Sequence, residues 1–338
     1  MKSCTTLRDL SRMANVSVNT ISRALNDRNG VNPQTKARIL NLAELHNYRP
    51  NLMARGMRIA QSRLIGTIVG DISDPFFVQL LSGIEEEASR EQMPIIIGNT
   101  AEDAYKQQTN LELLLSYGCR NIVITPVDTG LAFLDTLREV DAQCVIADRV
   151  PIDAPDCDCV AINIRRDSAR ATEYLIQCGH RRIALLNQRS DLRTETDRTA
   201  GYLDAMRERG LPVNDLWVAH CTGRESAGRS MRRILDLPEA ERPTAVFIAK
   251  DTLALDAVTA VYDSGLHIPD DLSVVLYGSP EWSQRLRPYF TCMVRAVSDI
   301  GRISARILIA KMRGEKTAAP VSILFDSSLV VRDSVRMI

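Results

Sequence analysis

The sequence contains no apolar run that approaches the roughly 20 residues needed for a membrane-spanning helix. Its first residues, MKSCTTLRDL, also lack the apolar core of a secretory signal peptide. We therefore expect a cytoplasmic protein without a membrane partner. In that compartment the 8 cysteines are expected to remain reduced thiols.

The sequence also lacks the common catalytic and phosphate-binding motifs. There is no glycine-rich phosphate loop, no nucleophile elbow and no H-E-x-x-H pattern. Only 4 histidines occur, and His180 lies between a helix and a strand in C-G-H-R-R, where a structural hydrogen bond explains it better than catalysis. Cys157 and Cys159 form the only close cysteine pair, whereas a zinc site needs about four ligands. We expect no catalytic residue, no bound metal and no cofactor.

The chain carries no net charge, but its charges are unevenly distributed. Basic and acidic residues each number 42. Residues 1–63 contain 11 basic and 3 acidic residues, a net charge of +8, which leaves −8 for the rest of the chain. A basic segment attracts phosphate groups and releases counterions on binding. A solvated arm would have the same charge, but the helical pattern within this segment favours a nucleic-acid-binding head.

That basic segment has the pattern of three short helices. Leu7, Leu10 and Met13 recur at helical spacing, with Ala14 beside them. A turn follows at Asn15-Val16, where asparagine tolerates a left-handed backbone. Ser17 is suited to cap a second helix, whose buried side is expected to consist of Val16, Ile21, Ala24 and Leu25. A third helix is expected from Asn32-Pro33 to about His46.

The start of the second helix exposes residues that can read DNA bases. Val18, Asn19 and Ser22 lie there, with Arg23 one step on. In a helix-turn-helix this part of the second helix enters the major groove. Asparagine can pair with adenine through two hydrogen bonds, and valine can contact a thymine methyl group.

The stretches DLSRMANVSVNTISRALN, NYRPN and ARGM resemble the LacI/GalR family of transcriptional regulators. Three positions depart from the usual family wording: Ser11 replaces alanine, Asn15 replaces glycine and Met57 replaces leucine. The resemblance implies that DNA is contacted by Thr6, Leu7, Ser17, Val18, Asn19, Thr20, Ser22, Arg23, Asn26, Asn51, Ala54, Arg55, Met57 and Arg58.

The resemblance also implies a hinge helix from Asn51 to Met57. In family complexes two leucines wedge between base pairs from the minor groove, and methionine can serve the same purpose. Gly56 weakens a helix by about 0.5–1 kcal/mol relative to alanine, and seven residues are too few for a helix stable alone in water. We expect this hinge to be disordered until DNA orders it.

After Arg63 the pattern changes to alternating apolar strands and helices. Strands are expected in LIGTIVGDI, PIIIGN, NIVITPV, CVIADR, VAIN, RIALLN, TAVFIAK and LSVVLYG, and helices at Phe77–Arg90, about Asp103–Tyr117 and near Leu131–Val140. Continuous apolar strands separated by helices indicate parallel sheets covered on both faces. Ligands of such sheets bind beyond the carboxyl ends of the strands, which here points to a cleft between two lobes.

The family resemblance continues, more loosely, through DISDPFF, QCGHRRIALL, DRTAGYLDAM, RPTAVFIAKD and GLHIPDDLSVVLYG. It implies an α/β fold with an all-α helix-turn-helix head and two doubly wound lobes of the periplasmic-binding-protein type, between which the chain crosses three times. The expected divisions are a head at 1–49, a hinge and linker at 50–62, and an effector-binding and dimerisation domain at 63–338. Within that domain the N-lobe is expected at about 63–162 and 293–323, and the C-lobe at about 163–292 and 324–338.

Effector contacts in the family come from strand ends, which implies Asp74, Phe77, Asp148, Arg149, Asn163, Arg198, Asp251 and Tyr277 here. Asn163 and Gly278 stand where the family usually has aspartate. The loss of two carboxylates beside Arg149 and Arg198 favours an anionic effector, such as a sugar acid or sugar phosphate. The alternative is a neutral sugar, with the two arginines paired to Asp148 and Asp251.

The sequence therefore predicts a transcriptional regulator rather than an enzyme. It would act as a repressor, with operator DNA, a small sugar-derived effector and a second copy of the chain as partners. A dimer on a palindromic operator is expected because one head offers only about four base-reading side chains, and no heptad tail for a tetramer follows Val330. The alternatives are a solute-binding protein, which would leave the basic head unused, and a sugar-modifying enzyme, for which the motifs are missing.

Overall fold

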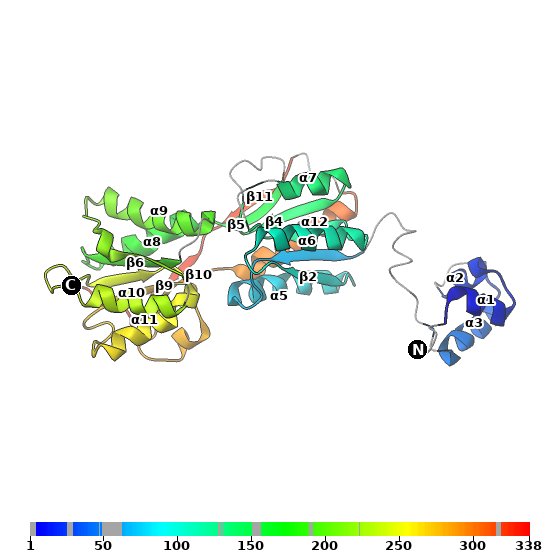
Figure 1. Ribbon diagram of the computed structural model, residues 1–338, viewed down its shortest axis with the longest axis horizontal. Coiled ribbons are helices and arrows are strands. Elements are labelled where there is room, and N and C mark those ends of the chain that lie inside the picture. Colours follow the sequence, from blue (N-terminus) through cyan, green and yellow to red (C-terminus); the bar gives the residue numbers. More distant parts are fainter. Residues whose placement is uncertain are drawn as a thin grey trace. The chain divides into compact units, whose positions relative to one another are not determined.

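The computed structural model describes residues 5–25, 30–46, 48, 63–127, 130, 132–150, 157–188, 192–222, 224–315 and 319–338. The chain divides into two compact units, Met1–Ala60 and Gln61–Ile338 (Figure 1). No helix in the described ranges is both long enough and apolar enough to cross a membrane.

The described residues of the smaller unit form three helices, α1 (Leu7–Ala14), α2 (Val18–Leu25) and α3 (Pro33–Leu45). As expected, Asn15 ends α1 in the left-handed conformation, with φ 49° and ψ 46°. Ser17 caps α2, since its hydroxyl accepts a hydrogen bond from the backbone N–H of Thr20 at 3.1 Å. Asn32 caps α3 in the same way, with Pro33 at its first position. The expected turn at Asn15-Val16, the cap Ser17 and the third helix from Asn32-Pro33 to about His46 are thus confirmed.

The core of the head is formed by six fully buried apolar residues, Leu10, Ala14, Ile21, Ala24, Ile39 and Ala43. Met13 was expected on this apolar side, but its side chain is 48% exposed. Ser11, one of the departures from the family wording, donates a hydrogen bond to the carbonyl of Val16 at 2.6 Å and so braces the turn. Arg38 of α3 donates to the carbonyl of Ala14 at 2.5 Å, which joins the third helix to the end of the first.

Several residues expected to contact DNA lie outside the described ranges. These are Asn26 and the hinge residues Asn51, Ala54, Arg55, Met57 and Arg58, together with Gly56. The expectations about a DNA-ordered hinge and a methionine wedge therefore stay predictions.

The larger unit contains two six-stranded sheets. The first lobe is built on the sheet with strand order β11-β5-β4-β3-β1-β2, in which every pairing is parallel. Its strands are β1 (Ile65–Val69), β2 (Ile95–Asn99), β3 (Asn121–Ile124), β4 (Gln143–Ala147), β5 (Asp158–Ile162) and β11 (Ser322–Phe325). Its helices are α5 (Pro75–Arg90), α6 (Ala104–Ser116), α7 (Ala132–Glu139) and α12 (Val297–Met312).

The second lobe is built on the sheet with strand order β12-β10-β9-β8-β6-β7, in which only β12 runs antiparallel to its neighbour. Its strands are β6 (Ile183–Gln188), β7 (Val218–Cys221), β8 (Ala245–Ile248), β9 (Ser273–Tyr277), β10 (Thr291–Val294) and β12 (Ser328–Val330). Its α-helices are α8 (Ile164–Gln177), α9 (Arg193–Glu208), α10 (Arg224–Leu235) and α11 (Asp251–Asp263), with short 3-10 turns η1 (Asp215–Trp217) and η2 (Glu281–Gln284).

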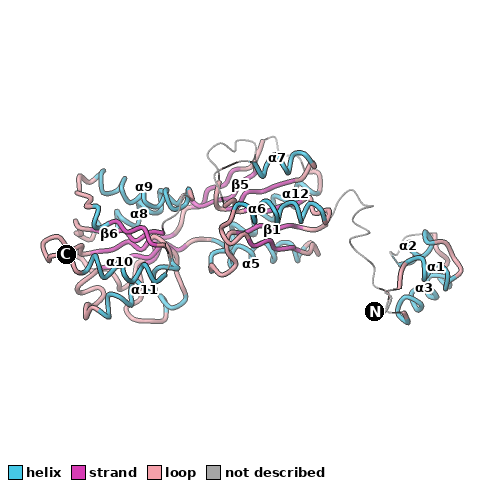
Figure 2. Tube along the Cα trace, in the orientation of Figure 1, coloured by secondary structure: helices cyan, strands magenta, loops and turns pink. Residues whose placement is uncertain are grey.

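Each sheet is covered by helices on both faces (Figure 2). Alternate strand residues point to opposite faces. In the second lobe Leu185 and Phe247 pack toward α8 and α9, whereas Leu186 and Ile248 pack toward α10 and α11. This explains why the strands read as continuous apolar runs, as expected for parallel sheets buried on both sides.

The chain passes between the two sheets three times. It crosses after β5, between β10 and α12, and between β11 and β12. We call these segments the first crossover (Asn163), the second crossover (Arg295–Ala296) and the third crossover (Asp326–Ser327). The strands β10 and β11 each continue two residues beyond the lobe boundaries expected from the sequence.

The order of strands reverses beside β1 in the first lobe and beside β6 in the second. Loops diverge at such a point, and the carboxyl ends of the strands there form a crevice. The strands that flank these points are β1 and β3 in the first lobe and β6 and β8 in the second, so a cleft is expected at the segments that follow them.

The left-handed Asn15 gives a testable consequence for the head. Alanine has no special tolerance for this conformation, so Asn15→Ala should weaken the head by about 1 kcal/mol, whereas Asn15→Gly should not. Hydrogen exchange of the Leu10 and Ile21 amides in the full chain measures the opening free energy of this unit. Equal protection in the alanine and glycine variants would contradict the assignment of strain to this turn.

Candidate functional site

The start of α2 presents a mixed polar and apolar surface. Asn19 and Arg23 are exposed, while Val18, Thr20 and Ser22 are half-buried. The hydroxyls of Ser17 and Thr20 lie 2.8 Å apart and take part in the cap of the helix. Asn19 is therefore the exposed amide side chain at this end of α2, in the position that sequence reasoning gave to the base-reading residue.

Thr6 and Leu7, two further residues expected at DNA, also have structural roles. The Thr6 hydroxyl accepts from the Asp9 backbone N–H at 3.2 Å, and the Thr6 backbone N–H donates to the Asp9 carboxylate at 3.0 Å, forming a capping box. The hydrogen bonds from Thr6 lower the pKa of Asp9. Leu7 packs half-buried against the head core.

Charged residues from both lobes of the larger unit converge at the strand ends to form the ligand cleft. It is lined by Asp74, Phe76, Phe77, Asp148, Arg149, Thr194, Glu195, Arg198, Lys250, Asp251 and Arg295. Six of the eight expected effector residues are in this set. Asp74 follows β1, Asp148 and Arg149 follow β4, and Asp251 follows β8, so the parallel strands bring them to one place.

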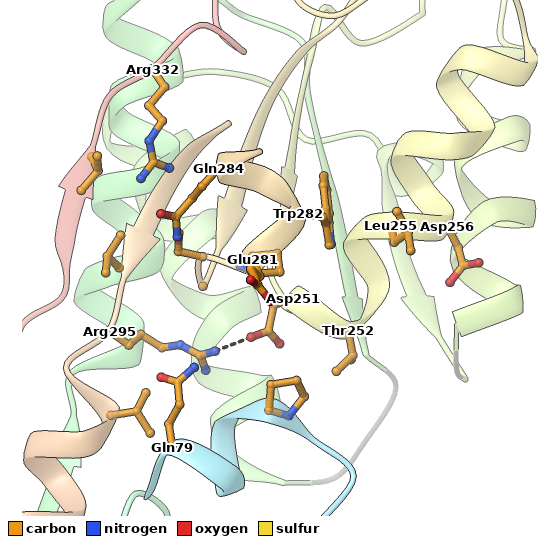
Figure 3. A pocket seen from close by; sticks show the side chains of 17 residues that line it. Gln79, Asp251, Thr252, Leu255, Asp256, Glu281, Trp282, Gln284, Arg295 and Arg332 are labelled. Atoms are coloured by element: carbon orange, nitrogen blue, oxygen red, sulfur yellow. Dashed lines mark hydrogen bonds and ion pairs between the residues drawn. The ribbon is translucent and has the colours of Figure 1, made fainter. Parts of the chain in front are cut away.

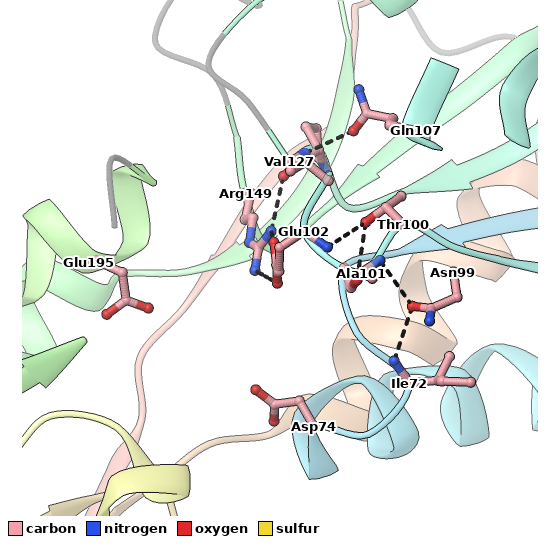
Figure 4. A network of polar contacts seen from close by, with 12 residues as sticks. Ile72, Asp74, Asn99, Thr100, Ala101, Glu102, Gln107, Val127, Arg149 and Glu195 are labelled. Carbon is pink, nitrogen blue, oxygen red and sulfur yellow. Dashed lines mark hydrogen bonds and ion pairs between the residues drawn. The ribbon is translucent and has the colours of Figure 1, made fainter. Parts of the chain in front are cut away.

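Arg149 is fixed by Glu102 from the loop after β2 (Figure 4). Two hydrogen bonds of 2.6 and 2.7 Å join its guanidinium to both carboxylate oxygens, and its guanidinium lies 5.4 Å from the centre of the Phe77 ring. Burial would lower the pKa of Arg149, but the paired Glu102 raises it overall. Glu102 reaches this position from a left-handed backbone with φ 59°. Its N–H donates to the carbonyl of Gly70 at 3.0 Å, which holds the loop against the end of β1.

A second group of charges spans the cleft. Glu195 and Arg198, one turn apart on α9, form a buried ion pair at 2.5 Å. Lys250 lies 3.7 Å from Glu195 and 3.6 Å from Asp74, which caps α5 in the opposite lobe. Burial would raise the pKa of Glu195, but Arg198 and Lys250 lower it overall. The Asp74–Lys250 pair therefore connects the two lobes across the cleft.

A further ion pair joins Asp251 to Arg295 at 2.6 Å (Figure 3). The Arg295 guanidinium lies 5.0 Å from the centre of the Phe76 ring and 5.3 Å from that of Tyr277. A Cβ atom at Gly278 would come within 2.8 Å of Asp251 and 2.9 Å of Arg295. The glycine that replaces the usual family aspartate therefore leaves room for this pair, and its φ of 99° suits glycine alone.

Asp148 differs from the other carboxylates of the cleft. It is only 9% exposed and adopts a left-handed backbone with φ 69°. Its carboxylate makes no hydrogen bond or ion pair within the described residues, and burial raises its pKa despite the nearby Arg149 and Arg198. A non-glycine residue held in this conformation is typical of a functional position.

Two expected effector residues lie elsewhere. Asn163 caps α8, where its side chain accepts from the Arg166 N–H at 3.4 Å, and it does not line the cleft. Tyr277 is fully buried beneath the cleft, with the Arg198 guanidinium 5.2 Å from its ring centre. Outside the cleft, His180 has the structural role expected of it, since it is buried and its Nδ1 lies 2.8 Å from the Thr244 hydroxyl.

Sequence reasoning missed four charged partners in and around the cleft: Glu102, Glu195, Lys250 and Arg295. Glu102 and Arg295 are polar residues close behind an apolar strand, a signal that could have identified them. Glu195 lies three residues before Arg198 on the same helix face. Lys250 directly precedes Asp251, and only the aspartate was selected.

The space at the centre of the cleft is small. It measures about 20 Å³, enough for one water molecule, whereas pockets for small molecules usually occupy about 300–1,000 Å³. Beside it lies a cavity of about 920 Å³ that shares Asp251 and Arg295 with the cleft. Gln79 of α5 and Trp282 of η2 lie on its walls (Figure 3). A ligand of sugar size must therefore occupy the larger cavity or separate the ion pairs at the centre.

The ion pairs of the cleft determine whether a cation is left to bind a charged ligand. The four cations of the cleft, Arg149, Arg198, Lys250 and Arg295, are each matched by a carboxylate. The arginines were expected to be free or to pair with Asp148 and Asp251. In the structure Arg149 pairs with Glu102 and Arg198 with Glu195, while Asp251 pairs with the unforeseen Arg295. Some hydrogen-bonding atoms remain unused among the described residues, namely Arg149 Nε, Arg198 Nε and Glu195 Oε2.

Comparison with known proteins places these features in a family. A family model described as bacterial regulatory proteins, lacI family, matches residues 6–51, and a periplasmic binding protein-like domain matches residues 172–335. The chain is 31% identical over 336 residues to the probable HTH-type transcriptional repressor ExuR of Bacillus subtilis (strain 168), with 98% of each chain covered. It is 29% identical to catabolite control protein A of Priestia megaterium, with 92% of this chain and 93% of the relative covered.

The fold is that of a solved lac repressor dimer bound to operator and the anti-inducer ONPF. The TM-score is 0.84 at 23% identity, with 99% of this chain and 100% of that chain covered. The identity to the Bacillus subtilis repressor extends through both the head and the lobes. The chain thus belongs to the lacI family of bacterial regulatory proteins, and it is a DNA-binding transcriptional regulator rather than an enzyme.

Proposed function

We propose that this regulator is a cytoplasmic repressor that binds a palindromic operator as a homodimer and responds to a neutral, polyhydroxylated sugar in the ligand cleft. One observation carries the choice of effector: each cation of the cleft already has a carboxylate partner. Relatives and neighbours include a ribose operon repressor and a regulator in complex with cellobiose, which supports a sugar.

The energies favour a neutral ligand over an anion. An anion that displaced Glu195 from Arg198 would leave a buried carboxylate without its arginine, and the loss of a partner by a buried charge costs up to about 3–5 kcal/mol. A neutral sugar leaves this ion pair intact. Its hydroxyl groups both donate and accept hydrogen bonds, so they can satisfy the Asp148 carboxylate and Glu195 Oε2 as acceptors and the two free Nε–H groups as donors.

Access to the cleft requires the lobes to part. The Asp74–Lys250 pair joins them, and Arg193 of the second lobe donates to the carbonyl of Val150 in the first at 3.1 Å. We propose that a sugar enters from the 920 Å³ cavity and replaces the Asp74–Lys250 contact with its own hydrogen bonds. Differential affinity for two lobe arrangements is what allows a ligand to shift DNA binding.

A dimer is supported by apolar side chains on the first lobe. Ile97 on the edge strand β2 is 48% exposed, Val78 on α5 is 53% exposed and Leu113 on α6 is 48% exposed. An exposed edge strand with apolar neighbours is a suitable interface for a second copy.

The effector class can be tested by comparing D-glucose and D-ribose with their aldonic acids and terminal phosphates. Calorimetry at one ionic strength should show binding by a neutral sugar and weaker binding by its acid and phosphate. In Glu102→Gln the Arg149 guanidinium loses its charged partner, so the acid should gain about tenfold in affinity, or about 1.4 kcal/mol. Asp135→Asn, which removes an exposed carboxylate on α7, serves as the control. Tightest binding of an acid or phosphate by the unaltered protein would refute a neutral effector.

The reading helix can be tested by DNA binding. Asn19→Ala should weaken specific binding by about 1–3 kcal/mol and relax the preference at one base pair per half-site. Arg8→Ala, if Arg8 contacts phosphate, should weaken all sequences alike. Operators selected from genomic DNA and random DNA are compared at one salt concentration. An unchanged base preference in Asn19→Ala would mean that α2 does not read the groove as proposed.

The oligomeric state can be measured by light scattering. The protein should be dimeric at micromolar concentration, and Val78→Glu should give monomers because it buries a charge in the interface. Leu216→Glu, at a residue 46% exposed in the second lobe, should leave the dimer intact. A monomeric parent protein would contradict the proposed interface.

A further inference from the structure

The third crossover is joined to the first turns of α8 by hydrogen bonds and an ion pair. The Ser327 N–H donates to both oxygens of the Asp167 carboxylate, at 3.1 and 3.2 Å. Arg170 donates to the Ser327 carbonyl at 2.8 Å, and Arg166 pairs with Asp326 at 2.9 Å. Nearby, the N–H of Asn163 in the first crossover donates to the carbonyl of Phe325 at 2.9 Å. The beginning of α8 therefore holds two of the three connections between the lobes.

Asp167 also connects this assembly to the ligand cleft. It is fully buried and accepts a hydrogen bond from the Tyr277 hydroxyl at 3.3 Å. The Tyr277 ring in turn lies against the guanidinium groups of Arg198 and Arg295, at 5.2 and 5.3 Å. Arg295 is itself part of the second crossover. Tyr277 is therefore in contact with a cleft arginine, the second crossover and, through Asp167, the third.

A buried carboxylate needs such partners to be tolerated. An unpaired charge in an apolar interior is strongly unfavourable, and here burial raises the pKa of Asp167 although hydrogen bonds from Ser327 oppose the shift. Tyr277, at the end of β9, belongs to the same lobe as Asp167, whereas Ser327 lies in the third crossover, so a rotation of the lobes reaches Asp167 through Ser327. Asp167 does not line the ligand cleft, so a direct contact with a ligand does not explain its burial.

We propose that Asp167 is a positioning residue that, together with Tyr277, couples the arginines of the ligand cleft to the second and third crossovers. A change at Arg198 or Arg295 moves the Tyr277 ring, and the hydroxyl–carboxylate contact passes the movement to Ser327. Relative motion of two lobes is absorbed by the few residues that connect them. This inference rests on the proposed role of the cleft as the effector site, but not on the class of effector.

The test uses operator DNA as the probe, so that no effector need be known. Coupling is reciprocal: if the cleft influences the head, DNA binding must influence the cleft. Hydrogen exchange of the full-length protein is measured with and without an operator duplex selected from genomic DNA. In the parent protein the operator should change exchange by several-fold both in the third-crossover peptide (322–332) and in the cleft peptide (192–200).

Two variants interrupt the link, and a third serves as the control. Tyr277→Phe keeps the ring beside the arginines but removes the hydroxyl, and Asp167→Asn keeps one acceptor oxygen but removes the charge. Tyr202→Phe removes the hydroxyl of another fully buried tyrosine of the same lobe, which donates to the Ile183 carbonyl, on β6, at 2.8 Å.

The expected result is that Tyr277→Phe retains the operator-dependent change at 322–332 and loses it at 192–200, while Tyr202→Phe keeps both. Asp167→Asn should behave as Tyr277→Phe does, and the double variant should lose no more than either single one, because both act on one contact. A full response of the cleft in Tyr277→Phe, or no response of the cleft in the parent protein, would overturn the proposal. If Asp167→Asn fails to fold, the exchange measured in Tyr277→Phe is sufficient for the test.

This test is independent of the effector class. A finding that the effector is an acid would refute the proposed neutral sugar and leave the Tyr277–Asp167 link unaffected.

Discussion

The requirement that buried charge be neutralised shapes the sensor of this protein. Parallel strands bring polar residues to their carboxyl ends, and two sheets facing each other bring several cations into a narrow space. Each of Arg149, Arg198, Lys250 and Arg295 is tolerated there because a carboxylate lies within ion-pair distance. The same pairing closes the centre of the cleft and holds the lobes together through Asp74 and Lys250. The effector must therefore work within a balanced set of charges.

Glycine and left-handed residues make this arrangement possible. Gly278 leaves the space in which Asp251 and Arg295 meet, and Glu102 reaches Arg149 only because its loop turns back with positive φ values. Such conformations are unfavourable for ordinary residues and persist when surrounding contacts hold them. Here those contacts are the hydrogen bonds from the loop to the end of β1. Strain is thus concentrated at the site where a ligand would act.

The head and the sensor achieve specificity in different ways. In the head, caps and a small apolar core fix two short helices so that Asn19 is left exposed. In the sensor, the polar groups that face the cleft are mostly engaged with one another. The buried Tyr277–Asp167 contact offers a physical connection from those groups to the segments that join the lobes. A ligand-controlled regulator needs a head with a fixed DNA-contacting surface and a ligand-binding unit whose lobes can move.

Much of the fold was determined by the sequence alone. Apolar periodicity and capping residues gave the three helices of the head, including the left-handed Asn15, because these signals are local. The long apolar runs gave eight of the strands for the same reason. The strands β7, β10, β11 and β12 were not recognised, since they lack the fully buried apolar run of the equally short β3 and β8 and are defined by the sheet they join. Met13 was misassigned because helical spacing alone does not show which face the neighbouring helices cover.

The site was only partly determined by the sequence. Residues behind strong strands, such as Asp74, Asp148 and Asp251, lie together at the cleft because parallel sheets place them at one edge, and their contact with an effector stays a prediction. The partner Glu102 was not identified, since Glu102 and Arg149 are far apart in the chain and meet only through the order of the strands. Glu195, by contrast, lies only three residues from Arg198 and was overlooked although this signal is local. Asn163 and Tyr277 occupy plausible positions in the sequence, but tertiary packing turned one into a helix cap and buried the other. Local patterns are written in the sequence, whereas the pairing of distant charges is decided by topology, because it depends on which strand ends become neighbours.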